Sequence, residues 1–357
     1  DHLKLTNQEI VNQINKTINE DNIKIVLFEG DHANIIDNDF IKNISDNVKK
    51  GIFLGDDMVW HIVNLITAQQ CDFVFSSEPI SVLKYKELGI KSLYVPIESD
   101  GKIFKDRKLQ KTYDVLHFGR EKTTRNKYIE HLKENSVKVK TVTPYDEESN
   151  TIEKLAVLIN QSKIVLNFAE SSNGDRKFNP LRIFKKFYQT KGRIQMAGLS
   201  NVLCISEYCA SSELLYNKDE LPFFKNKDDL LKKLNFYLSN KEELENATKK
   251  FYLKNLIYED SNYILKIKKF LDSLEINSKQ TINIPFWYRY LFLNQSLRLR
   301  YKDQKLNSFL KQFLDNIISA NKNDLTTTLK IMFTSIVLFL KYFPFIIIKK
   351  IINLKNE

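Results

Sequence analysis

The chain has 357 residues, which exceeds the size at which a single hydrophobic core usually stops growing, so we expect two domains and an appendage. Hydrophobic residues make up 43% of the sequence and aromatic residues 12%, and this composition excludes a disordered protein. The formal net charge of +11 favours a polyanionic partner, which is nucleic acid, anionic lipid or a phosphate-bearing metabolite. Charge alone does not choose among the three.

The first segments of the chain alternate between helix-like and strand-like patterns. Apolar residues recur at helical spacing between residues 3 and 19, and segment 22–30 then reads as a buried strand that ends in a glycine. The alternation continues with helices at 39–47, 57–68 and 81–88 and strands at 50–55, 71–76 and 92–95. Short apolar strands that alternate with helices predict a parallel sheet covered on both faces.

A polar stretch at 96–111 separates this block from a second one of the same kind. The second block has predicted strands at 113–119, 137–142, 162–168 and 202–206 and predicted helices at 123–135, 151–161 and 227–239. We therefore predict two Rossmann-like domains, an N-terminal one over residues 1–105 and a C-terminal one over 106–275, that face each other across a cleft. Ligands of such sheets bind at the carboxyl ends of the strands.

The character of the sequence changes in the extension 276–357. Segment 286–293 is aromatic and basic, and segment 331–348 is strongly apolar, although Lys341 and Pro344 within it weaken the prediction of a membrane-spanning helix. Flanking lysines favour an interfacial helix on anionic lipid; they are Lys330, Lys349, Lys350 and Lys355. A helical hairpin packed against the protein is the second interpretation, and a spanning helix is the third.

The three cysteines bear on the compartment. Cys71, Cys204 and Cys209 have spacings that match neither a zinc site nor a disulfide framework, which is typical of a reducing, cytosolic setting. The chain starts at Asp1 with no initiator methionine and no signal region, so we expect a fragment or a processed product. Together with the basic extension, this predicts a cytoplasmic protein bound peripherally to the inner face of the cytoplasmic membrane.

Two turns between strand and helix in the second block combine glycine with basic residues. The first turn contains Gly119, Arg120, Lys122, Thr123 and Arg125, and the second contains Lys191, Gly192 and Arg193. Such a turn offers backbone N–H groups, the positive end of a helix dipole and a guanidinium to one phosphate group. A basic helix N-terminus is more often a solvated surface, but two of them in one domain indicate a phosphate site.

Segments in a consistent order along the second block resemble a known family. They are DVLHFGR at 114–120, SKIVLNF at 162–168, KGRI at 191–194, CISEY at 204–208, ELL at 213–215 and FFKNKDDLLKKL at 223–234. In this order they are similar to the C-terminal domain of glycosyltransferases of the spore-maturation-protein (CgeB-like) type, within the GT-B fold group and glycosyl transferase family 1. The first block is similar to the N-terminal domains paired with them, through segments 55–60, 71–79 and 85–90.

The resemblance implies a bacterial hexosyltransferase that needs neither a metal nor a cofactor and takes a nucleotide-diphosphate sugar as its substrate. The acceptor would be a cell-envelope polysaccharide, a lipid-linked glycan or a protein, and it would approach from the N-terminal domain. Glu213 would accept the ribose hydroxyls, and Arg193 would neutralise the leaving diphosphate. Gly119, Arg120 and Arg125 would complete the phosphate side together with Lys191 and Gly192. The structural alternatives are a helix-terminal carboxylate for Glu213 and a surface ion pair for Arg193.

The sequence departs from the family at two positions. The family commonly has an acidic residue where this chain has Met196 and a glycine where it has Asn201. This departure motivates a second hypothesis, a non-catalytic nucleotide- or glycan-binding protein with the same fold. Nucleic-acid binding rests on charge alone and ranks last, so we expect no nucleic-acid partner.

The first block supplies the candidates for a catalytic base. Asp56 and Asp57 directly follow a predicted strand, where a carboxylate could accept the proton of an acceptor hydroxyl, and His32 follows Gly30 in a similar place. His61 is a further candidate. The alternative for the aspartates is that one of them caps the helix that follows. The sequence contains no metal-ligand spacing and no Asp-X-Asp motif of the other glycosyltransferase fold.

Overall fold

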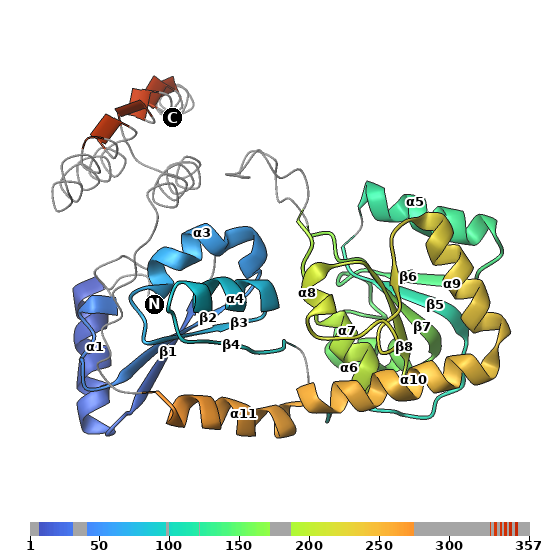
Figure 1. The fold of residues 1–357 in the computed structure, drawn as a ribbon, viewed down its shortest axis with the longest axis horizontal. Coiled ribbons are helices and arrows are strands. Elements are labelled where there is room, and N and C mark those ends of the chain that lie inside the picture. The colour runs from blue at the N-terminus through green and yellow to red at the C-terminus, as the bar shows by residue number, and fades with distance from the viewer. Residues whose placement is uncertain are drawn as a thin grey trace.

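The computed structural model describes residues 7–30, 41–97, 100–120, 122–171 and 187–274, together with helical residues at intervals between 329 and 348. The described residues form two parallel sheets, each combined with helices (Figure 1). The predicted α/β class with two Rossmann-like domains is therefore confirmed. Candidate His32 and the aromatic segment 286–293 lie outside the described residues.

The first sheet has four parallel strands in the order β1-β2-β3-β4. The strands are β1 (Ile25–Gly30), β2 (Lys49–Leu54), β3 (Phe73–Ser76) and β4 (Ser92–Tyr94), and the helices are α1 (Asn7–Glu20), α3 (Asp57–Ala68) and α4 (Pro79–Glu87). Every residue of the central strand β3 is buried, as in a parallel sheet covered on both faces, whereas Leu27 of the edge strand β1 is 52% exposed. Part of the helix expected over 39–47 lies outside the described residues.

The second sheet has five parallel strands in the order β6-β5-β7-β8-β9. The strands are β5 (Tyr113–Phe118), β6 (Val139–Val142), β7 (Ser162–Asn167), β8 (Leu203–Glu207) and β9 (Phe223–Phe224). The strand order reverses between β5 and β7, because the chain adds β6 on one side of β5 and then β7 on the other. Such a reversal opens a crevice at the carboxyl ends of the two strands, which is where doubly wound sheets bind ligands.

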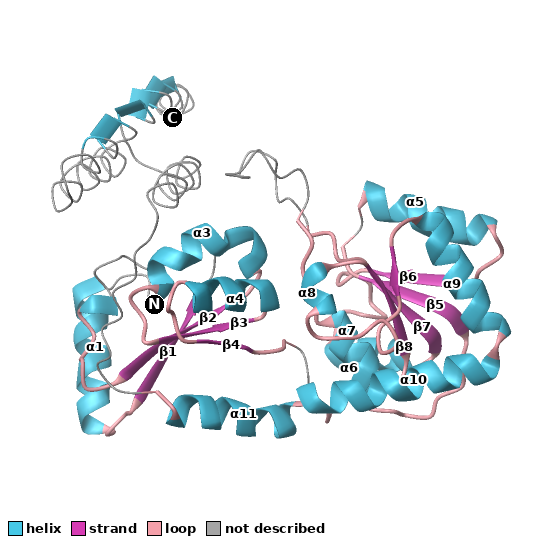
Figure 2. Ribbon diagram, viewed as in Figure 1, coloured by secondary structure: helices cyan, strands magenta, loops and turns pink. Residues whose placement is uncertain are grey.

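Helices cover both faces of the second sheet (Figure 2). They are α5 (Thr123–Glu134), α6 (Ile152–Asn160), α7 (Arg193–Leu199), α8 (Ala210–Glu213), α9 (Lys227–Ser239) and α10 (Lys241–Asn255). One core cluster contains residues of α5 and α9, and the other contains residues of α6, α7 and α10. The sequence does not predict α7 or α10; the buried face of α10 is narrow, with Phe251 and Asn255 its fully buried residues.

The chain returns to the first sheet after the second domain. A 3-10 turn, Leu256–Tyr258, leads into α11 (Asp260–Asp272), which lies along the N-terminal sheet (Figure 1). Tyr263 Oη donates a hydrogen bond of 2.6 Å to the carbonyl of Tyr94 in β4. Leu274, just beyond the helix, clusters with Phe73 and Phe75 of β3. Residues 260–274 therefore cover the first sheet although they follow the second in the chain.

Among the described residues, no helix is both long enough and apolar enough to cross a membrane.

Packing between α7 and α10 requires a glycine. A Cβ atom at Gly198 would lie 2.2 Å from Asn255 Cγ. Asn255 cannot move aside easily, because its amide donates to the carbonyl of Phe251 at 2.8 Å and accepts from Tyr216 Oη at 2.9 Å. The two helices can therefore approach this closely only because position 198 has no side chain.

We predict that Gly198→Ala lowers the free energy of unfolding by about 1–3 kcal/mol through overpacking, although alanine is the better helix former. Gly55→Ala is the matched control, because no atom lies within 4 Å of the added Cβ. The measurement is urea unfolding followed by circular dichroism. Equal unfolding midpoints for the two variants would contradict the packing argument.

Candidate functional site

Arg193 is held at the reversal point of the second sheet. It is the first residue of α7, and its Nη1 donates a hydrogen bond of 3.1 Å to Oδ1 of Asn167, the last residue of β7. The guanidinium lies 5.6 Å from the centre of the Phe118 ring at the end of β5. Residues that end the two central strands thus fix the position of this charge in the crevice.

Gly119 makes room for this arginine. Its φ of +133° lies in a region that side chains rarely adopt, and an added Cβ would lie 2.5 Å from Arg193 Nη2. Gly119 is also anchored, because its N–H donates to the carbonyl of Val142 at 3.0 Å. Two of the residues that the sequence assigned to donor binding, Gly119 and Arg193, therefore lie in direct contact.

Four cationic side chains converge here, and we call them the cationic cluster: Lys122, Arg125, Lys191 and Arg193. Burial, together with the charges of the other three cations, lowers the pKa of Lys191 to about 8, against the opposing effect of Asp56. Partial burial together with the neighbouring arginines also lowers the pKa of Lys122 to about 8. Lysines lose a proton more easily where other cations lie close, because like charges repel each other. A bound anion would reduce this repulsion among the four cations.

Arg125 has a bracing role within the cluster. It is 5% exposed, and its guanidinium donates to the carbonyl of Arg120 at 3.0 Å and to the carbonyl of Glu170 at 2.9 Å. It therefore joins the loop after β5 to the loop after β7 while it contributes its charge. The side chain of Arg120 is exposed, and in the contacts above this residue contributes its backbone carbonyl.

A cavity of about 250 Å³ opens beside Arg193, and we call it the anion pocket. Its lining combines the cations Lys191 and Arg193 with Gly119, Gly192 and apolar side chains that include Val142 and Pro144, and none of its described lining residues is acidic. Met196 forms part of the wall and is 4% exposed. The position where the family commonly has an acid thus lies in this pocket. The lining suits a ligand with a flat apolar part and an anionic part.

Glu213 lies apart from the residues that line the anion pocket. It is the last residue of the short helix α8. Its side chain is exposed and accepts a hydrogen bond of 2.8 Å from Tyr208 Oη. Its assignment to the ribose hydroxyls remains a prediction.

The structure separates the roles of the two adjacent aspartates. Asp57 is completely buried, and its carboxylate accepts hydrogen bonds from Asn64 Nδ2 at 2.7 Å, Ser76 Oγ at 2.8 Å and Tyr85 Oη at 3.0 Å. Burial raises the pKa of Asp57 to about 6, and the three hydrogen bonds oppose the rise. Its oxygens are thus occupied in joining α3 to β3 and α4, which is a structural task.

Asp56 faces the other domain. It is exposed, has a φ of 41°, and makes no side-chain cap hydrogen bond to α3. Instead its carboxylate accepts a hydrogen bond from Gln189 Nε2 of the C-terminal domain, and its charge raises the pKa of Lys191. Asp56 therefore lies where the two domains are in contact, near Lys191 of the cationic cluster.

His61 is a packing residue. It is 3% exposed, its ring centre lies 4.6 Å from that of Tyr85, and burial lowers its pKa to about 3. The imidazole is therefore neutral at pH 7 and enclosed, so that a substrate hydroxyl cannot reach it in this arrangement.

Sequence reasoning missed the residues that join the two domains. Glu78 is the N-cap residue of α4, and its Oε2 accepts a hydrogen bond of 3.2 Å from the N–H of Thr190. Gln195 of α7 donates to Tyr94 Oη at 3.3 Å and to Tyr216 Oη at 3.1 Å. A polar residue inside the apolar run of α7 was the available signal for Gln195. Within the described residues, no His, Cys, Asp or Glu side chains gather in groups that could hold a metal ion.

Comparison with known proteins identifies relatives of the fold. Residues 122–260 match the profile of a family described as "Glycosyl transferase-like". Sucrose-phosphate synthase from Thermosynechococcus elongatus is 9% identical with a TM-score of 0.50, over 74% of this chain and 77% of that one. This similarity shows the GT-B arrangement of two facing domains that the sequence resemblance implied.

Two further solved structures are similar at lower scores. HepE (Alr3699) of Anabaena in complex with UDP is 10% identical with a TM-score of 0.49, over 74% of this chain and 82% of that one. A glycosyltransferase from Rickettsia africae is 11% identical with a TM-score of 0.47, over 74% and 81%. No protein with a curated description matches.

The lowered pKa values of the cluster lysines predict a pH dependence. An ordinary lysine stays protonated to about pH 10.4, whereas Lys122 and Lys191 lose their protons near pH 8, so binding of inorganic pyrophosphate should weaken between pH 7 and 9 relative to a variant that keeps these charges. In the double variant Lys122→Arg/Lys191→Arg both positions stay charged. Calorimetric titration at each pH gives the pyrophosphate affinities of the unchanged protein and of the double variant. Their ratio does not depend on the ionisation of pyrophosphate, because both proteins bind the same ligand at the same pH.

Lys163→Arg is the control for this titration, because Lys163 pairs with Asp114 outside the cluster. It should reproduce the pH dependence of the unchanged protein. A constant affinity ratio between the unchanged protein and the double variant across this pH range would show that the cluster lysines do not titrate in it.

Proposed function

We propose that the protein transfers a hexose from a nucleoside-diphosphate sugar to a glycan, lipid-linked or protein acceptor of the cell envelope. A pocket at the reversal point of the second sheet carries this proposal: Lys191 and Arg193 line it, its described lining has no carboxylate, and the charges of Lys122 and Arg125 act on Lys191. The match of residues 122–260 to a glycosyltransferase-like family and the GT-B arrangement support it. Anions bind at such a crevice because backbone N–H groups and fixed cations face it.

The leaving group determines what the cluster has to do. The acceptor hydroxyl attacks the anomeric carbon, the bond from that carbon to the diphosphate breaks, and the nucleoside diphosphate leaves with an added negative charge. Arg193 and Lys191 would stabilise that charge, because Asn167 and Gly119 hold the guanidinium in place before the reaction starts. Positive charge supplied by side chains makes a divalent metal unnecessary, and unchanged turnover in EDTA is the expected result.

The acceptor's proton needs a base on the opposite side of the cleft. Asp56 is exposed there and belongs to the N-terminal domain, whereas Asp57 is enclosed by its three donors. The left-handed backbone of Asp56 is a local strain of the kind that occurs at functional sites, where the surrounding structure holds a residue in one conformation. We therefore assign the general base to Asp56.

The second candidate function is nucleotide or glycan binding without turnover. Met196 favours it, because this position in the wall of the anion pocket has an uncharged thioether where the family commonly has an acidic residue. Release of nucleoside diphosphate from UDP- or GDP-sugars in the presence of membrane extract distinguishes the two functions. Tight nucleotide binding with no release under any donor and acceptor supports the binding protein.

We predict that Arg193→Gln weakens UDP binding by about 10- to 100-fold, the cost of one charged hydrogen-bonding group. Lys163→Gln, which removes a cation outside the cluster, should leave the affinity unchanged. Asp56→Asn should keep the UDP affinity and lose transfer. Calorimetry with UDP and a nucleotide-release assay measure the two effects. Unaltered UDP affinity in Arg193→Gln would contradict the assignment of the anion pocket. Glu213→Ala tests the ribose contact in the same titration and should weaken UDP binding.

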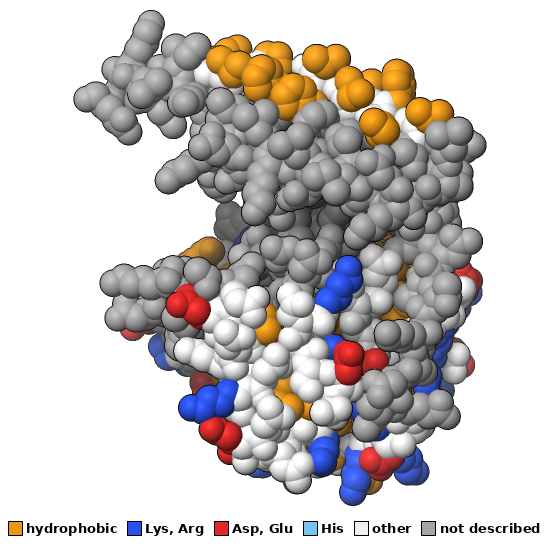
Figure 3. Space-filling view, turned by 90° about the vertical axis from the view of Figure 1, so that its left-hand side faces the viewer, with side chains coloured by type: hydrophobic (Ala, Val, Ile, Leu, Met, Phe, Trp, Pro, Cys, Tyr) orange, Lys and Arg blue, Asp and Glu red, His pale blue; other side chains and the backbone are white. Residues whose placement is uncertain are grey.

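The C-terminal segment supports attachment to a membrane surface. Large apolar side chains are exposed along its described helical residues, with Phe333 71% and Leu340 65% exposed, and they form a band at the top of Figure 3. Lysines flank the segment at positions 330, 349, 350 and 355. An exposed apolar face next to cations fits the boundary of an anionic bilayer, where envelope acceptors would be presented.

We predict that the protein floats with vesicles of phosphatidylglycerol and phosphatidylcholine, and that Phe333→Glu/Leu340→Glu abolishes flotation. Vesicles of phosphatidylcholine alone should bind less protein, because the cations then lose their partners. Tyr145→Glu, at an exposed aromatic residue of the C-terminal domain, is the matched control. Undiminished flotation of the double variant would exclude this face as the attachment surface.

A further inference from the structure

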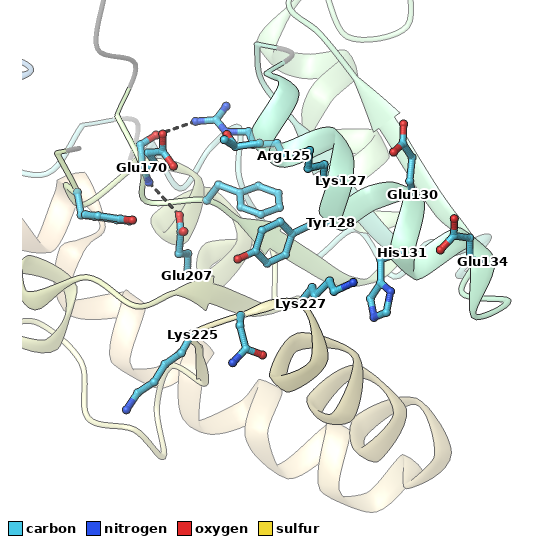
Figure 4. Close-up of a pocket in the computed structure, with 14 residues that line it drawn as sticks. Arg125, Lys127, Tyr128, Glu130, His131, Glu134, Glu170, Glu207, Lys225 and Lys227 are labelled. Atoms are coloured by element: carbon cyan, nitrogen blue, oxygen red, sulfur yellow. Dashed lines mark hydrogen bonds between the residues drawn. The ribbon is translucent and has the colours of Figure 1, made fainter. Parts of the chain in front are cut away.

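A second cavity lies on the flank of the C-terminal domain, between α5 and the start of α9 (Figure 4). We call it the flank trough. Its volume is about 610 Å³, compared with about 250 Å³ for the anion pocket. Arg125 holds two loops together in the proposed transferase, and the other residues of the trough have no role in the proposed reaction.

An aromatic surface lines part of the trough. The Tyr128 ring lies 5.4 Å from the Phe168 ring at a near-perpendicular angle and 5.8 Å from the ring of Phe224. Phe168 and Phe224 are buried in the core beneath, whereas Tyr128 is half-buried. The aromatic face is therefore rigid and in place before any ligand binds.

Charged groups in the trough are balanced. Its lining contains four cations, at residues 125, 127, 225 and 227, and four carboxylates, at residues 130, 134, 170 and 207. The anion pocket has cations without carboxylates, so the two cavities suit different ligands. A polyanion would meet four carboxylates in the trough, and an apolar ligand would leave the charged groups without water. A neutral ligand rich in hydroxyl groups can donate to the carboxylates, accept from the cations and pack its C–H faces on Tyr128.

One buried donor in the trough remains unsatisfied. Arg125 is 5% exposed, and its Nε has no hydrogen-bond partner among the described residues. Each of its two terminal nitrogens donates to a backbone carbonyl, so Nε is the guanidinium nitrogen that is left without an acceptor. A buried N–H of this kind is costly unless a water molecule or a ligand accepts from it.

The trough begins at the cationic cluster. Arg125 belongs to both, and Glu170 and Glu207, which line the trough, raise the pKa of Lys122. Glu207 Oε2 also accepts a hydrogen bond of 3.0 Å from the N–H of Glu170, which fixes this inner end (Figure 4). Tyr188 lines the same end and is followed by Gln189, which reaches Asp56 across the cleft.

We infer that the flank trough binds an oligosaccharide, the growing acceptor chain, with its reactive end at Arg125 and Tyr188 and its earlier sugars along α5 and α9. This inference rests on the proposed function. It differs from the sequence-based expectation that the acceptor is held by the N-terminal domain, and it leaves Asp56 as the base that receives the hydroxyl proton from across the cleft.

A fluorescent probe in the trough tests the inference directly. Lys227 is exposed at the outer end, and all three native cysteines are buried, so a Lys227→Cys variant can be labelled selectively in the folded protein. The probes are neutral malto-, cello- and chito-oligosaccharide series from two to six sugars. We expect at least one series to change the fluorescence, with affinity that rises with chain length. The same dye at Lys163→Cys, outside the trough, should not respond.

Glu130→Ala/Glu134→Ala removes two acceptors from the trough wall and keeps good helix formers in α5. It should weaken oligosaccharide binding about tenfold while the affinity for UDP stays unchanged. Glu242→Ala/Glu243→Ala on exposed α10 is the matched control and should alter neither.

Oligosaccharide binding and UDP binding are measured separately, so failure of the trough assignment can be distinguished from failure of the proposed function. A protein that binds UDP and turns over sugar donors but shows no probe response to any series would overturn the trough assignment alone. Absence of UDP binding and of turnover, with oligosaccharide binding intact, would overturn the proposed function. Displacement of the oligosaccharide signal by pyrophosphate would show that the trough is a phosphate site and would also overturn the inference.

Discussion

The contact among Arg193, Gly119 and Asn167 is the constraint on which the candidate site depends. A guanidinium can lie in this crevice because glycine leaves its volume free and the amide of Asn167 accepts one of its hydrogen bonds. The strand β5, which ends just before Gly119, and β7, which ends at Asn167, are neighbours at the point where the sheet order reverses. The charge is therefore fixed by the topology of the sheet, which also places the other three cations of the cluster beside it.

Two adjacent carboxylates show how burial assigns different tasks to one residue type. Asp57 is enclosed by three hydrogen-bond donors and holds α3, α4 and β3 together, so its carboxylate is not available to a substrate. Asp56, one residue earlier, is directed outward by its left-handed backbone and meets Gln189 of the other domain. The two aspartates are adjacent at a strand end, yet Asp57 stabilises the fold whereas Asp56 is exposed and can contact a substrate.

Two cavities of different charge character lie beside the cationic cluster, the anion pocket at Lys191 and Arg193 and the flank trough at Arg125. The anion pocket has cations and apolar walls, and the flank trough has balanced charges and an aromatic surface. A transferase needs one place for a charged donor and another for a hydroxyl-rich acceptor, and the cavities differ in the way these two substrates differ. The carbonyls of Arg120 and Glu170 hold Arg125 in place at the trough's side of the cationic cluster.

Apolar periodicity and turn residues in the sequence determined the alternation of strands and helices, the two-domain class and the importance of the turns at Gly119 and Arg193. These features are local, because strand burial and turn geometry depend on near neighbours in the chain. Only the tertiary structure decided that Asp57 is enclosed while Asp56 faces the cleft, that Glu213 lies outside the anion pocket, that α11 covers the first sheet and that Lys122 completes the cluster. Each of these depends on contacts between residues far apart in the sequence, and the burial and field at a side chain come from all the elements packed around it.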